Sequence, residues 1–182
     1  MAMYNVVIKR KVHATFNDAD KRSVKCASDV ENGGVFALKT RSTVDGEDEV
    51  WVATAPAVAT DGSLWMAVSP EVVTTKTGDL QFRGVVNDPR YFTNIAGTVF
   101  DAIKLCVGDI VEIAPGDGIS AADIKADAYL IPTAGATVLA PSATANTAGL
   151  SLHKVDTGVL HIGQAGLVKS ATPTYIYEVE AN

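Results

Sequence analysis

Histidine is the side chain best suited to acid–base or metal chemistry near neutral pH, and this chain has three: His13, His153 and His161. His153 and His161 lie on either side of Asp156-Thr157-Gly158, a run typical of a turn, so we expect them to be neighbours across a hairpin. Two such imidazoles can bind zinc, but a structural zinc site has four ligands and no cysteine is near them in the sequence. The histidines are therefore predicted to be polar positions on a half-exposed sheet.

Two acidic stretches, Asp45–Glu49 and Asp117–Asp127, raise calcium binding as an alternative. A calcium loop of the EF-hand type needs oxygen ligands at fixed spacings, and neither stretch has them. We interpret both as exposed acidic segments and predict no metal and no other cofactor.

Other patterns that support catalysis are not found in the sequence. The nucleophilic serine of many hydrolases sits in G-x-S-x-G, and neither Ser120 nor Ser151 does. Gly116-Asp117-Gly118 lacks the lysine of a phosphate-binding loop. Two acids could still meet in space as a glycosidase pair, but the sequence singles out no such pair. The chain is therefore predicted not to be an enzyme.

The charge distribution argues against nucleic acid as a partner. The formal net charge is −6, whereas a phosphate backbone attracts clustered Lys and Arg. The short basic groups, Lys9-Arg10-Lys11 and Lys21-Arg22, are flanked by acids or apolar strand residues and are predicted to be solvated faces. No membrane segment and no signal peptide are expected, because no apolar run has the required length.

The two cysteines, Cys26 and Cys106, each lie in a strand-like run. Two cysteines in 182 residues do not form a disulfide framework. We expect two small buried thiols in a protein made in a reducing cytoplasm. Whether the two meet is left open.

Short apolar runs between turn signals predict an all-β fold. Apolar residues make up 47% of the chain, and the many valines favour strands because a branched Cβ suits a pleated surface. The closing run is the clearest strand, with Tyr175, Tyr177 and Val179 on one face. Trp51 is expected to be a core anchor, and the other large aromatics are expected in the core rather than on a carbohydrate platform. The predicted strands are 4–9, 23–28, 35–39, 50–53, 64–68, 98–107, 110–113, 129–131, 136–140, 150–155, 159–162 and 174–179.

Turns and one helix complete the predicted fold, a small β-barrel or β-sandwich with at most one or two short helices. Asn32-Gly33-Gly34 predicts a hairpin, and Gly108-Asp109 predicts a tight turn between two strands. Residues 119–128 are the best helix candidate, with Ser120 as N-cap and Asp123 in the third helical position. The length suits a single domain, 1–182, and a division into two lobes, 1–85 and 86–182, is left open.

One stretch resembles a known family. The run from Phe92-Thr93-Asn94 to Gly97, followed by a strand and by Gly108-Asp109, is similar to a segment of tailed-bacteriophage head decoration proteins, also called capsid cement proteins. The segments Val50–Thr54 and Leu64–Glu71 and the aromatic strand Tyr175–Val179 also resemble that family. The Ser142–Gly149 run departs from its pattern.

The resemblance implies a virion structural protein without enzymatic activity. Such a protein binds the outer surface of the expanded phage head, has the major capsid protein as its partner, and acts as many symmetry-related copies on the shell. Lys9, Arg10 and Lys11 end a segment that could be an arm toward the capsid or an ordinary first strand. The alternatives are a tail tube or other virion β protein, and a carbohydrate- or peptide-binding module.

Overall fold

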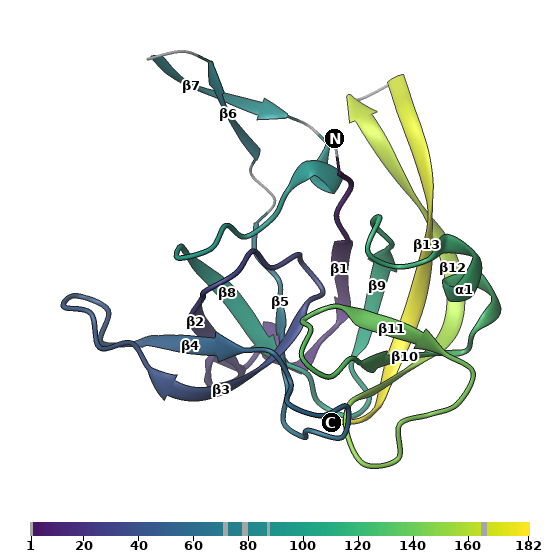
Figure 1. Ribbon diagram of the computed structural model, residues 1–182. Helices are drawn as coiled ribbons and strands as arrows, with labels where there is room; N and C mark the ends of the chain where they lie inside the picture. Colours follow the sequence, from purple (N-terminus) through teal and green to yellow (C-terminus); the bar gives the residue numbers. More distant parts are fainter. Residues whose placement is uncertain (1, 71–72, 78–79, 87, 165–166) are drawn as a thin grey trace.

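The chain folds as a mainly β protein, as the sequence predicts. A closed barrel packs against a six-stranded sheet (Figure 1). The computed structural model describes residues 2–70, 73–77, 80–86, 88–164 and 167–182; within 71–87 and 163–170 it describes backbone elements only. The described helices are short: one α-helix and three single 3-10 turns. They are α1 (Ala121–Ala126), η1 (His13–Thr15), η2 (Asp18–Asp20) and η3 (Pro89–Tyr91).

The barrel has five strands in the order β2, β4, β3, β5 and β8 around its wall. β2 runs parallel to β4, and the other neighbouring pairs are antiparallel. Closure pairs every strand on both sides, so the barrel wall has no open edge. The strands are β2 (Lys21–Cys26), β3 (Val35–Arg41), β4 (Val50–Thr54), β5 (Trp65–Ala67) and β8 (Val99–Lys104).

The sheet has six strands in the order β1, β9, β13, β12, β10 and β11, and all its neighbouring pairs are antiparallel. Its faces alternate as the sequence predicts: Tyr175, Tyr177 and Val179 are buried, whereas Glu178 and Glu180 are exposed. The strands are β1 (Val6–Lys11), β9 (Ile110–Ala114), β10 (Tyr129–Pro132), β11 (Leu139–Ser142), β12 (Ser151–Gln164) and β13 (Leu167–Ala181).

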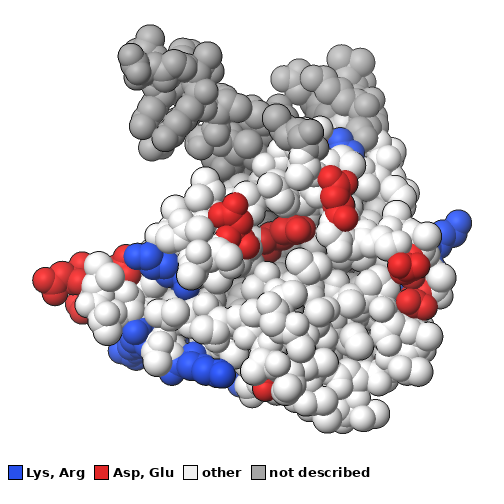
Figure 2. Space-filling view, in the orientation of Figure 1, with Lys and Arg blue, Asp and Glu red and all other residues white. Residues whose placement is uncertain are grey.

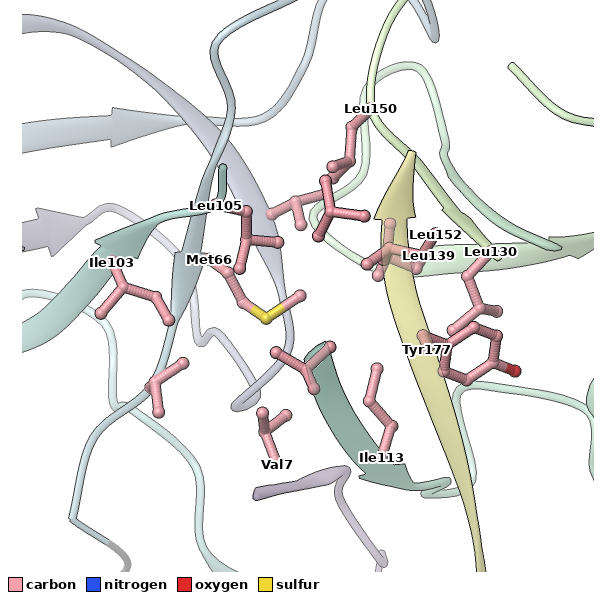
Figure 3. Close-up of a cluster of buried hydrophobic side chains, with 14 of the residues drawn as sticks. Val7, Met66, Ile103, Leu105, Ile113, Leu130, Leu139, Leu150, Leu152 and Tyr177 are labelled. Carbon is pink, nitrogen blue, oxygen red and sulfur yellow. The ribbon is translucent and has the colours of Figure 1, made fainter. Parts of the chain in front are cut away.

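One hydrophobic core joins the barrel to the sheet. Met66 and Ile103 come from the barrel and meet Ile113, Leu152 and Tyr177 from the sheet (Figure 3). A second cluster fills the barrel, where Phe36 and Phe100 meet edge to face with ring centroids 5.8 Å apart, a favoured aromatic geometry. The barrel and the sheet are therefore held together by shared buried surface, which is the main stabilising term in folding.

The ranges 1–85 and 86–182 each contribute strands to the barrel and to the sheet. Residues 1–85 supply β1 to the sheet and four strands to the barrel. Residues 86–182 supply β8 to the barrel and the other five strands to the sheet. The two ranges are thus interleaved through β1 and β8.

Gly108-Asp109 forms the predicted turn, but the strands beside it do not pair with each other. Gly108 has a φ of +89°, which glycine adopts without strain. β8 pairs with β2 and β5 in the barrel, and β9 pairs with β1 and β13 in the sheet. The turn therefore carries the chain from the barrel to the sheet. The predicted hairpin at Asn32-Gly33-Gly34 is wrong for a similar reason, since β4 lies between β2 and β3.

The predicted turn at Asp156-Thr157-Gly158 is also wrong, because these residues lie inside β12. β12 pairs with β13 from Ser151 to Gln164, and Gly158 lies opposite Thr174. His153 and His161 therefore share one strand and are not cross-strand neighbours. The sequence also predicts a turn at 163–166, and part of this range lies outside the described residues.

The helix is where the sequence predicts it. Ser120 is the N-cap of α1, and its hydroxyl accepts a hydrogen bond from the backbone N–H of Asp123 at 3.4 Å. Ile124 is fully buried and fixes the helix against the core.

Two β-ribbons project from the same end of the molecule, at the top of Figure 1. The first is the pair β6 (Val73–Thr77) and β7 (Leu80–Val86), which forms its own two-stranded sheet. The second is the far part of β12 and β13: Gly158–Gln164 and Leu167–Thr174 pair only with each other in the described ladder. In the described ladders, neither ribbon therefore has a third strand paired beside it.

Candidate functional site

The basic segment singled out by the sequence is part of the sheet. Lys9, Arg10 and Lys11 end β1, which pairs with β9, and all three are exposed. Lys11 lies opposite Ile110, and Val6 lies opposite Ala114. Because the β12–β13 ribbon continues past the Ala114 end of β9, the basic segment lies at the other end of the sheet from this ribbon.

Arg10 reaches a carboxylate that is almost completely buried. Its Nε and Nη2 lie 2.7 and 2.6 Å from Glu112 Oε2, and the Glu112 side chain is 3% exposed. The hydroxyl of Thr174, also buried, donates to the other carboxylate oxygen, Oε1. Pairing and hydrogen bonding of this kind offset the cost of burying a charge. The arrangement joins β1, β9 and β13 and has a structural role.

A cavity of about 480 Å³ lies between β1, the η1–η2 turns and the barrel. Its charged lining is mixed: Lys9, Lys21, Arg22 and Arg41 face Asp18, Glu49 and Asp101. Lys21 pairs with Asp18 at 2.9 Å. This mixture of both signs gives no strong field for a single charged ligand.

The two tryptophans are partly exposed and packed against the barrel core, so the expectation that Trp51 is a core anchor holds in part. Arginine covers each ring: the guanidinium carbon of Arg41 lies 5.3 Å from the centre of Trp51, and that of Arg22 lies 5.3 Å from Trp65. Such cation–π stacking occupies the face that a sugar would use. Of the other aromatics, Phe100 is buried, and Tyr91 and Phe92 are half-buried.

The histidines have separate, ordinary surroundings. His153 stacks on Tyr129 with centroids 5.0 Å apart and lies 3.2 Å from Glu180, and His13 lies 3.6 Å from Asp20. In the part of the chain that the structure describes, no three His, Cys, Asp or Glu side chains are grouped so as to hold a metal ion. None of the described helices combines the length and hydropathy required to cross a bilayer.

The two cysteines do not meet. Both are free thiols, with Cys26 buried and Cys106 partly exposed. Burial raises the pKa of the Cys106 thiol, and Asp109 adds to the shift, which makes this thiol a poor nucleophile at neutral pH.

Arg90 ties the bases of the two projecting ribbons together. It follows β7 by four positions, and its Nη1 donates to Thr172 Oγ1 in β13 at 3.0 Å. Its Nε and Nη2 bond the two carboxylate oxygens of Asp88 at 3.0 and 2.8 Å. These charge-assisted bonds hold the pKa of Asp88 below its usual value. Tyr4 N–H donates to the Arg90 carbonyl at 2.7 Å, which fixes the same point to the N-terminal segment.

A groove of about 460 Å³, lined by both apolar and polar residues, opens beside the start of β8. Its apolar lining comes from η3 and the loop before β8, from β8, and from the connection between β5 and β6. These residues are Pro70, Tyr91, Phe92, Ile95, Val99 and Phe100. Apart from the aromatic pair Tyr91-Phe92, no sequence pattern predicts this groove.

The face seen in Figure 2 has no large patch of one charge among the residues described. Acidic and basic side chains are scattered over it, with the basic ones mainly over the β3–β4 side of the barrel. This scatter agrees with the mixed lining of the 480 Å³ cavity. Neither this face nor the cavity therefore forms a site of a single charge.

Comparison with known proteins finds no family model, no curated protein and no solved structure that matches this chain. The structure itself defines the class: a mainly β protein made of a closed five-stranded barrel, a six-stranded sheet and two projecting β-ribbons.

Proposed function

We propose that this protein is a virion structural protein that binds the outer surface of a phage capsid and stabilises the expanded head. The observation that carries the proposal is the pair of β-ribbons that project from one end of a closely packed β body (Figure 1). The resemblance of residues 92–112 to head decoration proteins supports it.

Each ribbon offers backbone groups to a partner. A strand at the edge of a two-stranded ribbon has unpaired N–H and C=O groups, which bind an extended segment by adding a strand. The β6–β7 ribbon and the outer part of β12–β13 both have such edges. Strand addition to the major capsid protein would need no reactive side chain.

The hydrogen bond between Arg90 and Thr172, which links the two ribbons, fits a protein that grips the shell with both ribbons. Arg90 joins the connection after β7 to Thr172 in β13, so the two ribbons share one base. A base that is already ordered reduces the entropy lost on binding. Many copies on a symmetric shell add their individual contacts, so each contact can be modest.

Two regions of this protein are candidates for the surface that faces the shell: the end with the two ribbons and the basic segment. We assign it to the ribbon end. Lys9, Arg10 and Lys11 lie at the opposite end of the sheet and form the alternative contact for an acidic capsid surface.

The decisive experiment incubates the purified protein with expanded, undecorated heads and images the complex by electron microscopy. We expect saturable binding at symmetry-related positions. A variant in which residues 73–86 are replaced by a short Gly-Ser linker should lose binding, whereas Lys9→Glu with Lys11→Glu should keep it. Loss only in the basic-segment variant would move the contact to the other end, and no binding by the unaltered protein would overturn the function.

A carbohydrate-binding module remains the alternative from another class. Its test is Trp65→Ala, which removes a ring packed on the barrel core and stacked under Arg22. We expect a loss of about 3 kcal/mol in unfolding free energy, the low end for tryptophan because the ring is partly exposed. Loss of glycan binding with unchanged stability would favour the module.

A further inference from the structure

A strap formed by residues 3–5 precedes β1 and is held by two carboxylates. Met3 N–H donates to Asp117 Oδ2 at 2.8 Å, and the Met3 carbonyl accepts from Asp117 N–H at 2.7 Å. Asn5 N–H donates to Glu31 Oε2 at 2.9 Å. Hydrogen bonds from backbone N–H groups to an ionised carboxylate are charge-assisted and strong. The two acids therefore fix the strap to the body of the protein.

The loop 116–118 fits closely around the strap. Gly116 N–H donates to Asn5 Oδ1 at 2.6 Å, and a Cβ at position 116 would lie 2.5 Å from the Tyr4 carbonyl carbon. A Cβ at position 118 would lie 3.1 Å from Glu31 Oε1. The Gly-Asp-Gly run, which has no lysine for a phosphate site, thus allows the close approach of the strap backbone.

The middle of the strap is bound to the base of the ribbons. Tyr4 N–H donates to the Arg90 carbonyl at 2.7 Å, and the Arg90 side chain bonds Thr172 in β13. The strap therefore lies at the end from which the two ribbons project (Figure 1). The other charged group at this contact is Asp88, whose carboxylate pairs with the Arg90 guanidinium at 2.8 Å.

Within the described residues, no cation pairs with either carboxylate that holds the strap: neither Glu31 nor Asp117 forms a salt bridge. Glu31 is half-buried, and Asn5, which contacts it, is 3% exposed. Burial without a counter-charge disfavours the ionised form of a carboxyl group. Burial accordingly raises the pKa of Glu31 above its usual 4.5, the bond from Asn5 N–H offsets part of this rise, and the like charge of Asp117 adds to it.

The strap is also placed where local opening is easiest. Chain ends open more readily than the core, and the residues from 2 to 4 are exposed or half-buried. Opening would return the Glu31 carboxylate to water and remove the cost of its burial. The closed strap therefore binds a proton at Glu31 more tightly than the open strap does.

We propose that the strap is a pH-dependent device that is closed in acid and opens increasingly as the pH rises. Below about pH 4.5 Glu31 is protonated in both states, so closure has its full stability. As the pH rises through the higher pKa of the closed state, ionisation of Glu31 favours opening. The Arg90–Asp88 pair stays charged in this range, because Arg90 lowers the pKa of Asp88 from 3.8.

Opening removes the bond from Tyr4 to the Arg90 carbonyl, so it loosens one contact at the ribbon base. The device does not rest on the capsid proposal, and it is measured on the purified protein alone.

Hydrogen exchange of the Tyr4 and Asn5 amides, followed by NMR, tests the proposal. In the unaltered protein, the open fraction of the strap should increase by a factor of about two or more between about pH 4.5 and about pH 7. Glu31→Gln removes the titrating group and keeps an oxygen that can accept from Asn5, so this increase should disappear. Each variant is compared with the unaltered protein at the same pH, which cancels the intrinsic pH dependence of exchange.

Two further variants serve as controls. Glu49→Gln makes the same chemical change at an exposed position in the connection between β3 and β4, and it should keep the full increase. Gly116→Ala places a methyl group against the strap backbone, so it should speed exchange of Tyr4 and Asn5 at every pH.

The amide of Val179 reports on opening of the whole fold. Val179 is fully buried, and its N–H donates to the Asp109 carbonyl at 2.9 Å. It should exchange at least about tenfold more slowly than the strap amides, because the strap opens locally. Strap exchange only at the rate of Val179, or an open fraction that stays constant or falls as the pH rises, would overturn the proposal. An increase that survives in Glu31→Gln would overturn it as well.

Discussion

Gly158 in β12 lies directly against the carboxylate of Glu112, although β13 separates their strands: a Cβ at position 158 would come within 2.6 Å of Glu112 Oε1 and 2.7 Å of Thr174 Oγ1. The glycine therefore makes room for the buried hydrogen bond between Thr174 and Glu112. It also lies where the β12–β13 ribbon leaves the sheet.

Gly158→Ala should destabilise the protein by about 1–3 kcal/mol, because the added methyl group must displace a buried polar pair. The measurement is the free energy of unfolding in urea. Gly62→Ala is the matched control, since a Cβ there would meet nothing within 4 Å and the φ angle is not left-handed. It should be neutral or stabilising by up to about 1 kcal/mol. Equal effects at both positions would contradict the assigned role of Gly158.

Gly158 also explains why the turn predicted at residues 156–158 is wrong. Asp156-Thr157-Gly158 has the composition of a turn, but here glycine serves a close approach inside a strand. The side chain responsible, Glu112, is 46 positions away and gives no local signal. Features set by neighbouring residues were predicted correctly, such as the Ser120 cap and the alternation from Tyr175 to Val179.

Local sequence patterns could not predict which strands pair with each other. Gly108-Asp109 is a turn, but whether the flanking strands pair depends on which other strands occupy their edges. The tie from Arg90 to Thr172 spans 82 positions, so neither residue could be recognised in advance. The groove beside the start of β8 likewise depends on how distant loops meet.

Arg10 and Glu112 should behave as a coupled pair. Arg10→Met leaves the Glu112 carboxylate buried with Thr174 as its remaining side-chain donor, and Glu112→Gln leaves Arg10 facing an amide. Each change should cost about 1–3 kcal/mol. The double variant should cost less than the sum of the two, which a double-mutant cycle in urea measures. Strict additivity would show that the two side chains do not stabilise one another.

The bond between Arg90 and Asp88 predicts a dependence of stability on pH. Arg90 lowers the pKa of Asp88 from its usual 3.8, so Asp88 binds a proton more readily in the unfolded chain. Its contribution is present above about pH 4 and is lost as the pH falls through the lower folded-state pKa. Arg90→Met should therefore lower stability at neutral pH, and the difference from the unaltered protein should shrink in acid.

Urea unfolding at a series of pH values checks this prediction. Lys125→Met, at an exposed position on α1, is the control and should change stability by no more than about 0.5 kcal/mol at any pH. Hydrogen exchange should also show faster opening of the backbone near Thr172 in the Arg90 variant. A difference that stays constant down to the acid limit would exclude Asp88 as the group linked to Arg90.

Tyr177 should limit stability at high pH. Its ring is fully buried, and its hydroxyl has no hydrogen-bond partner among the described residues; Figure 3 shows the oxygen at the margin of the core cluster. Burial raises the pKa of Tyr177 far above its usual 10. The unfolded chain therefore releases this proton above pH 10 while the folded chain keeps it, so stability falls as the pH rises.

Tyr177→Phe removes both the unpaired hydroxyl and the titration. At neutral pH the variant should be at least as stable as the unaltered protein and should gain up to about 1 kcal/mol, because an unsatisfied buried donor is costly. Above pH 10, the unaltered protein should lose about 1.4 kcal/mol per pH unit relative to the variant. Parallel urea titrations near neutral pH and around pH 11 measure both effects. Destabilisation at neutral pH together with identical slopes in alkali would show that the hydroxyl has a partner and does not titrate on unfolding.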